Sequence, residues 1–179
     1  SRVARRPPGT GAVRHARGLC QNRTMIETPQ VIQCSVGMRW GDMDAYGHVN
    51  NVEILRILEE ARIHAFGPPG GTGGPGREPV VALFNNVPAG TQALVAEHRV
   101  KYLIPLTYRN IPADIAVWIS ALKGASLTIA YVIRDPVTGE TCAKAETTLA
   151  FVDGGTGRLL RIVPEQKELL RPYLGASVF

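Results

Sequence analysis

The sequence predicts an α+β domain in which one long helix packs on an antiparallel sheet. Segment 51–66 repeats apolar residues with the period of a helix, whereas several segments after residue 80 alternate with the period of a strand. Short connections join these later segments, which is typical of antiparallel strands. With 179 residues the chain is long enough for one such domain and too short for two of ordinary size.

The first predicted strand is Val31–Trp40, and a turn-like stretch over Gly41–Gly47 follows it. The longest predicted helix is Asn51–Phe66, whose first turn Asn50 or Asn51 can cap with a side-chain oxygen. One face of this helix is apolar at spacings of four, three and four residues, namely at Ile54, Leu58, Ala61 and Ala65.

The helix is expected to stop at Gly67, Pro68 and Pro69, after which a Gly- and Pro-rich loop extends to Pro79. Within that loop, Gly71–Gly76 matches the pattern GxGxxG of dinucleotide-binding sites. That pattern has to lie between a strand and a helix, whereas here it follows a helix. We therefore interpret it as a loop without a nucleotide.

Period-two alternation predicts the remaining strands over Val80–Phe84, Leu94–Ile104, Ile115–Leu122, Leu127–Arg134 and Glu140–Val152. Asp135–Gly139 contains Pro and Gly and predicts the turn between the last two strands. Pro164 can open a short C-terminal helix that reaches Tyr173.

The basic character of the chain is concentrated in its N-terminal tail. Residues 1–25 hold six arginines and no acid, whereas the whole chain has a net charge of +5, so the remainder carries −1. A groove that follows phosphates would need its cations in the folded part, so we expect no nucleic acid partner. We divide the chain into a basic tail (1–29), a globular domain (30–164) and a C-terminal helix and tail (165–179).

The cysteines predict neither a disulfide framework nor a zinc site, because Cys20, Cys34 and Cys142 are odd in number and far apart. No apolar stretch approaches the ~18 residues of a membrane span, and the N-terminus lacks the apolar region of a secretory signal. We expect a cytoplasmic protein that contacts no membrane.

The densest group of polar residues is the segment 39–51, which precedes the predicted helix. It contains Asp42, Asp44, His48, Asn50 and Asn51. A helix N-terminus has unpaired N–H groups and a partial positive charge, so it can hold an oxyanion that develops on a carbonyl. A nearby carboxylate could attack that carbonyl or deprotonate a water molecule. The segment therefore holds the parts of an acyl-transfer site.

Each of these residues also has a structural interpretation. Asp42 or Asp44 could cap or brace the turn, and His48 could be a histidine that only stabilises the fold. Asn50 and Asn51 are good helix caps with no further role required. A metal site made of Asp42, Asp44 and His48 matches no zinc pattern, so we expect no metal.

The string RWGDMDAYGHVNN at residues 39–51 closely resembles hotdog-fold acyl-CoA thioesterases of the 4-hydroxybenzoyl-CoA thioesterase type. The resemblance continues in Glu59-Glu60-Ala61-Arg62, in the segment 100–106 and in the segment 156–164, and it covers about residues 31–164. It implies a hotdog fold, with an antiparallel sheet of five to six strands wrapped around one long central helix. It also implies an active site between two subunits, so we expect a homodimer at least and a tetramer as the full assembly.

The resemblance implies a thioesterase that hydrolyses acyl-CoA, with coenzyme A as part of the substrate and no separate cofactor. Asp44 matches the catalytic carboxylate and would act as nucleophile or general base, while the N–H of Asn51 matches the oxyanion donor. Asn50 is adjacent to that donor. His48 stands at a position that is usually histidine, where it orients the turn or transfers a proton.

The turn Lys123, Gly124, Ala125 and Ser126 matches the place where relatives hold the nucleotide end of coenzyme A. Some relatives carry two cations there, whereas this chain has Lys123 alone, so Arg158 is a second candidate for the phosphates. Arg109-Asn110 replaces the Gly-Asp of many relatives, which leaves the role of that loop open.

Two alternatives remain from the sequence. One is a hotdog hydratase or dehydratase, which would need an Asp and a His that both face the α and β carbons of the acyl group. The other is an acyl-CoA binder without enzymatic activity. The length and aromaticity of the acyl group, and the choice between coenzyme A and a carrier protein, are left open.

Overall fold

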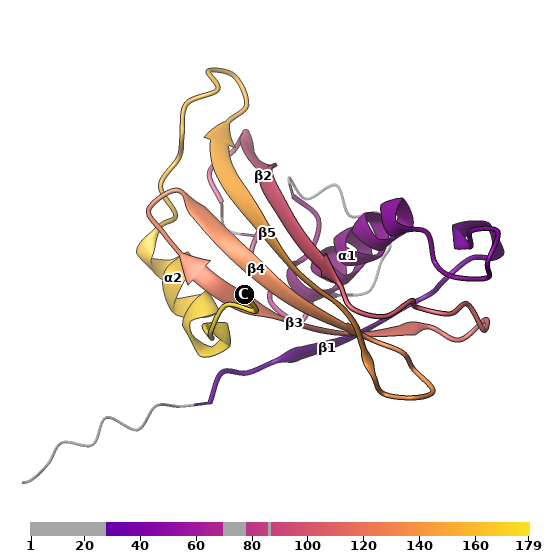
Figure 1. Cartoon of the computed structure of the whole chain (residues 1–179). Coiled ribbons are helices and arrows are strands. Elements are labelled where there is room, and N and C mark those ends of the chain that lie inside the picture. Colours follow the sequence, from indigo (N-terminus) through magenta and orange to yellow (C-terminus); the bar gives the residue numbers. More distant parts are fainter. Residues whose placement is uncertain (1–27, 70–77, 86) are drawn as a thin grey trace, which may run out of the picture.

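The computed structural model of the chain describes residues 28–69, 78–85 and 87–179. It contains one five-stranded antiparallel sheet in the order β1-β3-β4-β5-β2, shown in Figure 1. The strands are β1 (Ile32–Val36), β2 (Thr91–Tyr102), β3 (Ala113–Leu122), β4 (Ser126–Arg134) and β5 (Thr141–Asp153). The helices are α1 (Asn51–Phe66) and α2 (Pro164–Leu170), with 3₁₀ turns at Trp40–Asp42 and Arg171–Tyr173. The predicted antiparallel sheet with a helix is confirmed.

β2 is an edge strand of the sheet and pairs only with β5 among the described strands. Tyr102 lies opposite Ala143 at one end of this pair, and Thr91 lies opposite Asp153 at the other end. A bulge between Val95 and Glu97 interrupts the register. The register defines two ends of the sheet: the Tyr102 end, next to the start of α1, and the Thr91 end.

α1 begins and ends at the residues that the sequence predicts. The side chain of Asn50 accepts a hydrogen bond from the N–H of Val52, which satisfies one free donor of the first turn. The N–H of Gly67 donates to the carbonyl of Ile63, and Gly67 has a φ of 82°, which glycine adopts without strain.

The core lies between α1 and the sheet. The buried face of α1 packs on β1 and β3, where the thiol of Cys34 lies 3.5 Å from the carbonyl oxygen of Ala61. β4 is almost entirely buried, as expected for the strand in the middle of the sheet. Phe84 and Phe151 stack at the Thr91 end with ring centroids 6.1 Å apart.

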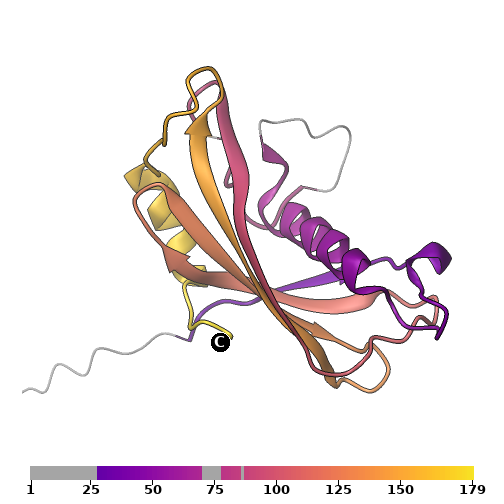
Figure 2. The ribbon, with the colours of Figure 1, turned by 45° about the horizontal axis from the view of Figure 1, so that its top comes forward.

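The structure does not support the expectation of one long central helix wrapped by the sheet. α1 has 16 residues and is about 24 Å long, whereas β2 and β5 have 12 and 13 residues and extend for about 40 Å. Figure 2 shows α1 on one side of the curved sheet. The helix stops at Gly67 because that residue and the prolines after it cannot continue it, and most of β2 is left exposed.

Two other elements differ from the prediction. The segment Val80–Phe84 is not a strand: the N–H of Val81 donates to the carbonyl of Ala65, and Leu83 donates back to Val81. Val81, Leu83 and Phe84 are buried near the end of α1, whereas Val80 is exposed, so the apolar pattern reflects burial without strand pairing. The first strand is five residues long and ends at Val36, because Trp40–Asp42 forms a 3₁₀ turn instead.

The C-terminal segment crosses the face of the sheet that is turned away from α1. The N–H of Gly175 donates to the carbonyl of Ile119 on β3. Further contacts follow across the sheet: Trp118 Nε1 to the carbonyl of Ala176, Val178 N–H to Glu146, and Arg99 over the ring of Phe179. The segment therefore spans the strands from β3 to β2.

Some expectations concern residues outside the described ranges, namely most of the basic tail and the GxGxxG segment 71–76. Across the described helices, none is long and apolar enough to span a membrane.

Candidate active site

The predicted catalytic segment folds as a 3₁₀ turn followed by a tight loop, and the loop leads into α1. The N–H of Asn50 donates to the carbonyl of Asp42 over 2.8 Å, so the loop closes directly before the helix. Within the loop, the N–H of Asp44 donates to the carbonyl of His48 over 2.7 Å. Gly47 has a φ of 78°, a left-handed conformation that other residues adopt only with strain.

Asp42, the first acid of the pair, is buried and has a structural role. Its Oδ2 accepts from the backbone N–H of Arg39 at 2.7 Å and from Arg56 Nη2 at 2.6 Å. Burial alone would raise the pKa of Asp42, but the Arg39 N–H and the charge of Arg56 outweigh it, so the pKa lies below its usual value. Because Arg56 is on α1, this carboxylate fastens the 3₁₀ turn to the helix.

Asp44, the second acid, is half-buried in the loop. Its Oδ1 accepts from the N–H of Tyr46 at 2.8 Å and from the N–H of His48 at 3.1 Å. Within the described residues Oδ2 has no hydrogen-bond partner. The carboxylate is thus held by one oxygen while the other is available to a ligand.

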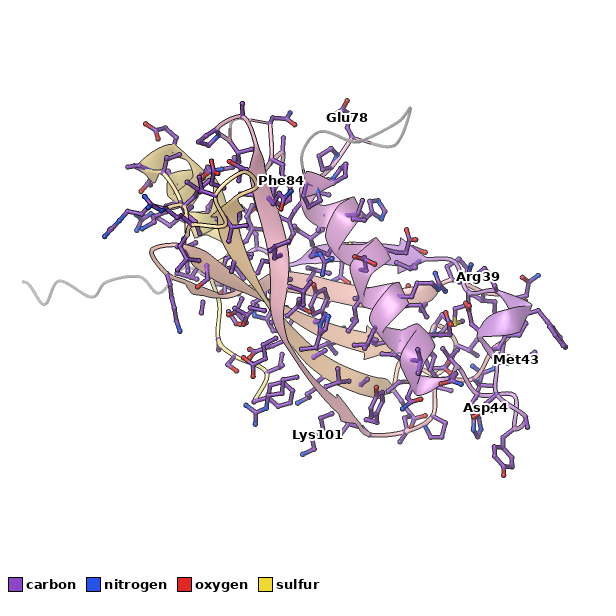
Figure 3. The ribbon with its side chains drawn as sticks, turned by 90° about the horizontal axis from the view of Figure 1, so that it is seen from above. Arg39, Met43, Asp44, Glu78, Phe84 and Lys101 are labelled. Atoms are coloured by element: carbon purple, nitrogen blue, oxygen red, sulfur yellow. The ribbon has the colours of Figure 1, made fainter. Side chains whose placement is uncertain are left out.

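Figure 3 shows Arg39, Met43 and Asp44 gathered beyond the N-terminal end of α1, with Glu78 and Phe84 near its other end. The backbone of His48 pairs with Thr107, which joins the loop to the segment after β2. The two bonds to Oδ1 show that Asp44 braces its own turn, as the structural interpretation expects. This role is compatible with a chemical role for Oδ2. The imidazole of His48 makes no hydrogen bond within the described part of the chain.

The start of α1 offers a free donor. Asn50 is the cap, Asn51 is the first helical residue, and the N–H of Asn51 has no acceptor among the residues that the structure describes. The helix dipole adds partial positive charge at this position. This N–H can therefore donate to an oxyanion.

Asn51 also lines a cavity of about 230 Å³. The other lining residues are mostly apolar: Val49, Ile54, Tyr102, Leu103, Ile104, Pro105, Leu106, Cys142 and Ala143. The hydroxyl of Tyr102 donates to the carbonyl of Asn51 over 3.2 Å, which ties the end of β2 to the start of the helix. Asp44, His48 and Asn50 are not among the lining residues.

Cys142 is the thiol in this cavity, and it is not activated. Burial raises its pKa above the usual value for a cysteine, followed by a smaller effect of the nearby Asp135 carboxylate. A nucleophilic cysteine requires the opposite shift, because the thiolate is the reactive form.

The predicted coenzyme A residues lie at the other end of the sheet. The turn Lys123–Ser126 joins β3 and β4, whereas Ala113, at the start of β3, pairs with Val36 near the loop that holds Asp44. About nine residues of strand separate the two ends of β3, which corresponds to about 30 Å. One chain therefore does not bring Lys123 and Asp44 together.

The structure does bring the two parts of the predicted coenzyme A site near each other. The N–H of Asp153 donates to the carbonyl of Arg158, and the N–H of Ile162 donates to the carbonyl of Gly124. The loop that carries Arg158 therefore lies beside the turn that contains Gly124, Ala125 and Ser126. Among the described residues, no group of three His, Cys, Asp or Glu side chains is placed to hold a metal ion.

Sequence reasoning missed three residues of the site: Arg56, Tyr102 and Cys142. Arg56 follows Glu53 by three residues and pairs with it at 2.9 Å, a spacing that was visible in the sequence. No comparable signal linked Arg56 to Asp42, or Tyr102 to Asn51, because these contacts join distant segments.

Comparison with known proteins identifies the family of the chain. Residues 38–170 match the model of the Thioesterase-like superfamily. Over 136 residues the chain is 27% identical to the uncharacterized protein YsmA of Bacillus subtilis (strain 168), an alignment that covers 75% of this chain and 82% of that protein.

Solved structures share the fold. A thioesterase-superfamily protein from Jannaschia sp. CCS1 superposes with a TM-score of 0.66 at 18% identity and covers 84% of this chain and 97% of its own. A thioesterase from Thermus thermophilus, complexed with coenzyme A and Zn, has a TM-score of 0.57 at 24% identity, and the match covers 78% of this chain and 91% of that one. A DHNA-CoA thioesterase from Staphylococcus aureus has a TM-score of 0.58 at 16% identity, and the match covers 78% of this chain and 87% of that one. At these identities the likeness concerns the fold alone.

Proposed function

Since the chain belongs to the thioesterase-like superfamily, we propose that it hydrolyses acyl-CoA thioesters to the free acid and coenzyme A. The family supports thioester hydrolysis in general, and the Thermus structure with coenzyme A supports that compound as the thiol part of the substrate. The observation that carries the proposal is the N–H of Asn51, which has no acceptor among the described residues and lies at the start of α1 beside a mostly apolar cavity.

In this proposal the thioester carbonyl oxygen accepts a hydrogen bond from the N–H of Asn51. The donor and the helix dipole stabilise the negative charge that develops on this oxygen when the carbonyl carbon is attacked. The apolar wall of the cavity excludes water and strengthens this interaction.

Asp44 provides the attack in one of two ways. As a nucleophile, its Oδ2 bonds to the carbonyl carbon, the carbon–sulfur bond breaks, and coenzyme A leaves as the thiolate. Water then cleaves the mixed anhydride and restores the carboxylate. As a general base, Oδ2 takes a proton from the water that attacks the carbonyl, the carbon–sulfur bond breaks, and the proton passes to the departing thiolate of coenzyme A.

A second copy of the chain would complete the site. Asp44 lies outside the cavity lining, and the proposed coenzyme A residues Lys123 and Arg158 lie at the far end of the sheet. Among the described strands β2 is an edge with one side of its backbone unpaired, and it has exposed apolar side chains, among them Val95 and Tyr102. A homodimer that pairs these edges antiparallel would place the Thr91 end of one copy beside the Tyr102 end of the other.

The experiment is an assay of thiol release over short, long and aromatic acyl-CoAs, with wild type and Asp44→Asn. Asn keeps the oxygen that accepts from Tyr46 and His48, so the loop is expected to stay folded. We expect kcat/KM to fall by about 10²–10⁴-fold, the usual contribution of such a group. Asp114→Asn, on exposed surface of β3, is the matched control and should retain activity.

A folded Asp44→Asn protein with near wild-type activity would refute the role of Asp44. Hydration of an unsaturated acyl-CoA without thiol release would favour the hydratase alternative. Incorporation of ¹⁸O into Asp44 during a single turnover would identify it as the nucleophile.

A further inference from the structure

A second polar group lies under α1, away from the catalytic loop. It comprises Arg62 on α1, Tyr131 on β4, Thr147 on β5 and His98 on β2, which we call the Arg62 cluster. Arg62 is 7% exposed, while Tyr131 and Thr147 are fully buried. Buried polar and charged groups destabilise a fold unless they have partners, so the partners of these groups are informative.

The hydroxyl of Tyr131 has no hydrogen-bond partner within the described part of the chain, although Arg62 and Thr147 are its polar neighbours. Burial raises the pKa of Tyr131 to about 12, so the hydroxyl keeps its proton and stays a donor. A buried hydroxyl without an acceptor is rare in folded proteins and requires an explanation, such as a bound group.

The charge of Arg62 is only partly compensated. Nη2 donates to Glu59 Oε1 at 2.8 Å, and the side chain of Glu59 is 57% exposed. Within the described part of the chain, another polar group beside the guanidinium is the hydroxyl of Tyr131, which carries no charge and leaves that of Arg62 uncompensated. A buried cation whose one ion pair is open to solvent favours a further acceptor, above all an anionic one.

His98 adds a third donor at the open side of the cluster. Its Nδ1 lies 2.9 Å from Thr147 Oγ1. When the Thr147 hydroxyl donates to Nδ1, the proton of the neutral imidazole is on Nε2. Burial, followed by the nearby charge of Arg62, lowers the pKa of His98, which favours this neutral form.

The distance from the Arg62 cluster to the cavity at Asn51 is comparable with the length of a medium-length acyl chain. His98 pairs with Thr147 on the same face of the sheet as Tyr102 and Ala143, about four residues further along each strand, or about 13 Å. Arg62 follows the cavity residue Ile54 by about two turns of α1, or about 12 Å. β2 and α1 thus place His98 and Arg62 at similar distances from the cavity that Asn51 lines.

We propose that the Arg62 cluster binds a carboxylate, or another hydrogen-bond acceptor, at the far end of the acyl group. The inference rests on the proposed function, because it takes the acyl group to extend from Asn51 along β2 and β5. Arg62 supplies the charge, and the hydroxyl of Tyr131 with Nε2 of His98 supplies neutral donors.

The test compares three acyl-CoAs with the same carbon chain: decanoyl-CoA, ω-hydroxydecanoyl-CoA and sebacoyl-CoA, which ends in a carboxylate. Wild type is expected to prefer sebacoyl-CoA over decanoyl-CoA by at least about tenfold in kcat/KM, with the hydroxyl compound between them. Arg62→Met and Tyr131→Phe should each reduce this preference, whereas Lys101→Met, on the exposed outer face of β2, should retain it.

Three outcomes would overturn the proposal: no preference in the wild type, an unchanged preference in both variants, or an equal loss on all three substrates. Tyr131→Phe removes one oxygen only, so it decides the question if Arg62→Met does not fold. Binding of free sebacic and decanoic acid, measured by calorimetry, separates this proposal from the proposed function. Absence of all thiol release would refute the hydrolase, while stronger binding of sebacic acid that depends on Arg62 would still support the cluster.

Discussion

Asp42 Oδ2 and Arg56 Nη2 lie 2.6 Å apart and join the 3₁₀ turn before the Asp44 loop to the second turn of α1. This ion pair ties the turn that precedes Asp44 to the helix that begins at Asn51. Arg39 contacts the same carboxylate from the other side, at 3.2 Å through its Nε. The 3₁₀ turn and α1 are therefore joined by side-chain contacts, which the sequence alone does not indicate.

Replacing Arg56 with Met should lower both stability and activity. The buried Asp42 would lose its closest cation and keep only Arg39, so we expect the free energy of unfolding to fall by about 1–3 kcal/mol. Denaturant unfolding and thiol release measure the two effects. Arg171→Met is the control, because its ion pair with Glu168 is exposed on both sides and should matter little. Equal stability of the two variants would contradict this role of Arg56.

Stability should decrease at acidic pH partly through Asp42. Its folded pKa is below the value of about 3.9 in the unfolded chain, so its contribution is complete above about pH 4 and is lost as the pH falls through the folded pKa. Asp42→Asn should therefore be less stable than wild type at neutral pH, and the difference should shrink below pH ~4. Unfolding curves over a pH series measure this, and a constant difference would count against it.

Filling the cavity should block the substrate. Ala143→Leu adds three carbons to the lining of a space of about 230 Å³. We expect kcat/KM to fall by about 10–200-fold, the usual effect of a steric change in an apolar pocket. Ala176→Leu, at an exposed position of the C-terminal segment on the other face of the sheet, should have no such effect. If Ala143→Leu is folded and fully active, the acyl group binds elsewhere.

A charge on the free edge of the sheet should dissociate the proposed dimer. Val95 on β2 is 43% exposed, and Val95→Lys would place an ammonium group where a second copy is expected. Sedimentation should then show a smaller species, and thiol release should fall with it. Leu169→Lys, equally exposed on α2, should leave assembly unchanged. A wild-type monomer with full activity would refute the shared site.

Gly175 should tolerate no side chain. A Cβ there would lie 2.9 Å from Cγ of Pro29 and 3.0 Å from Cδ1 of Trp118, so the C-terminal segment would have to move off β3. We expect Gly175→Ala to lower the free energy of unfolding by about 1–3 kcal/mol, as overpacking usually does. Gly37→Ala, with no atom within 4 Å of the added carbon, is the control. Thermal unfolding distinguishes the two.

Local pattern was sufficient for most elements. The helix over 51–66 follows from its apolar spacing and the cap at Asn50, and the later strands follow from alternation. The same reasoning was wrong for Val80–Phe84, because a short apolar run signals burial and does not specify what it pairs with. It was also wrong about a long central helix, because neither the sequence of α1 nor that of β2 shows how far the sheet extends beyond the helix.

The order of residues along the chain was enough to predict the polar loop, the helix that follows it and the resemblance to thioesterases, because these depend on neighbouring residues. The folded chain was needed to separate the two acids: Asp42 is buried between two arginines, while Asp44 keeps one oxygen unpaired among the described residues. It also revealed the Arg62 cluster, whose members come from four different elements. Contacts of this kind depend on strand order and register, which are decided when distant segments pack together. No pattern in neighbouring residues predicts them.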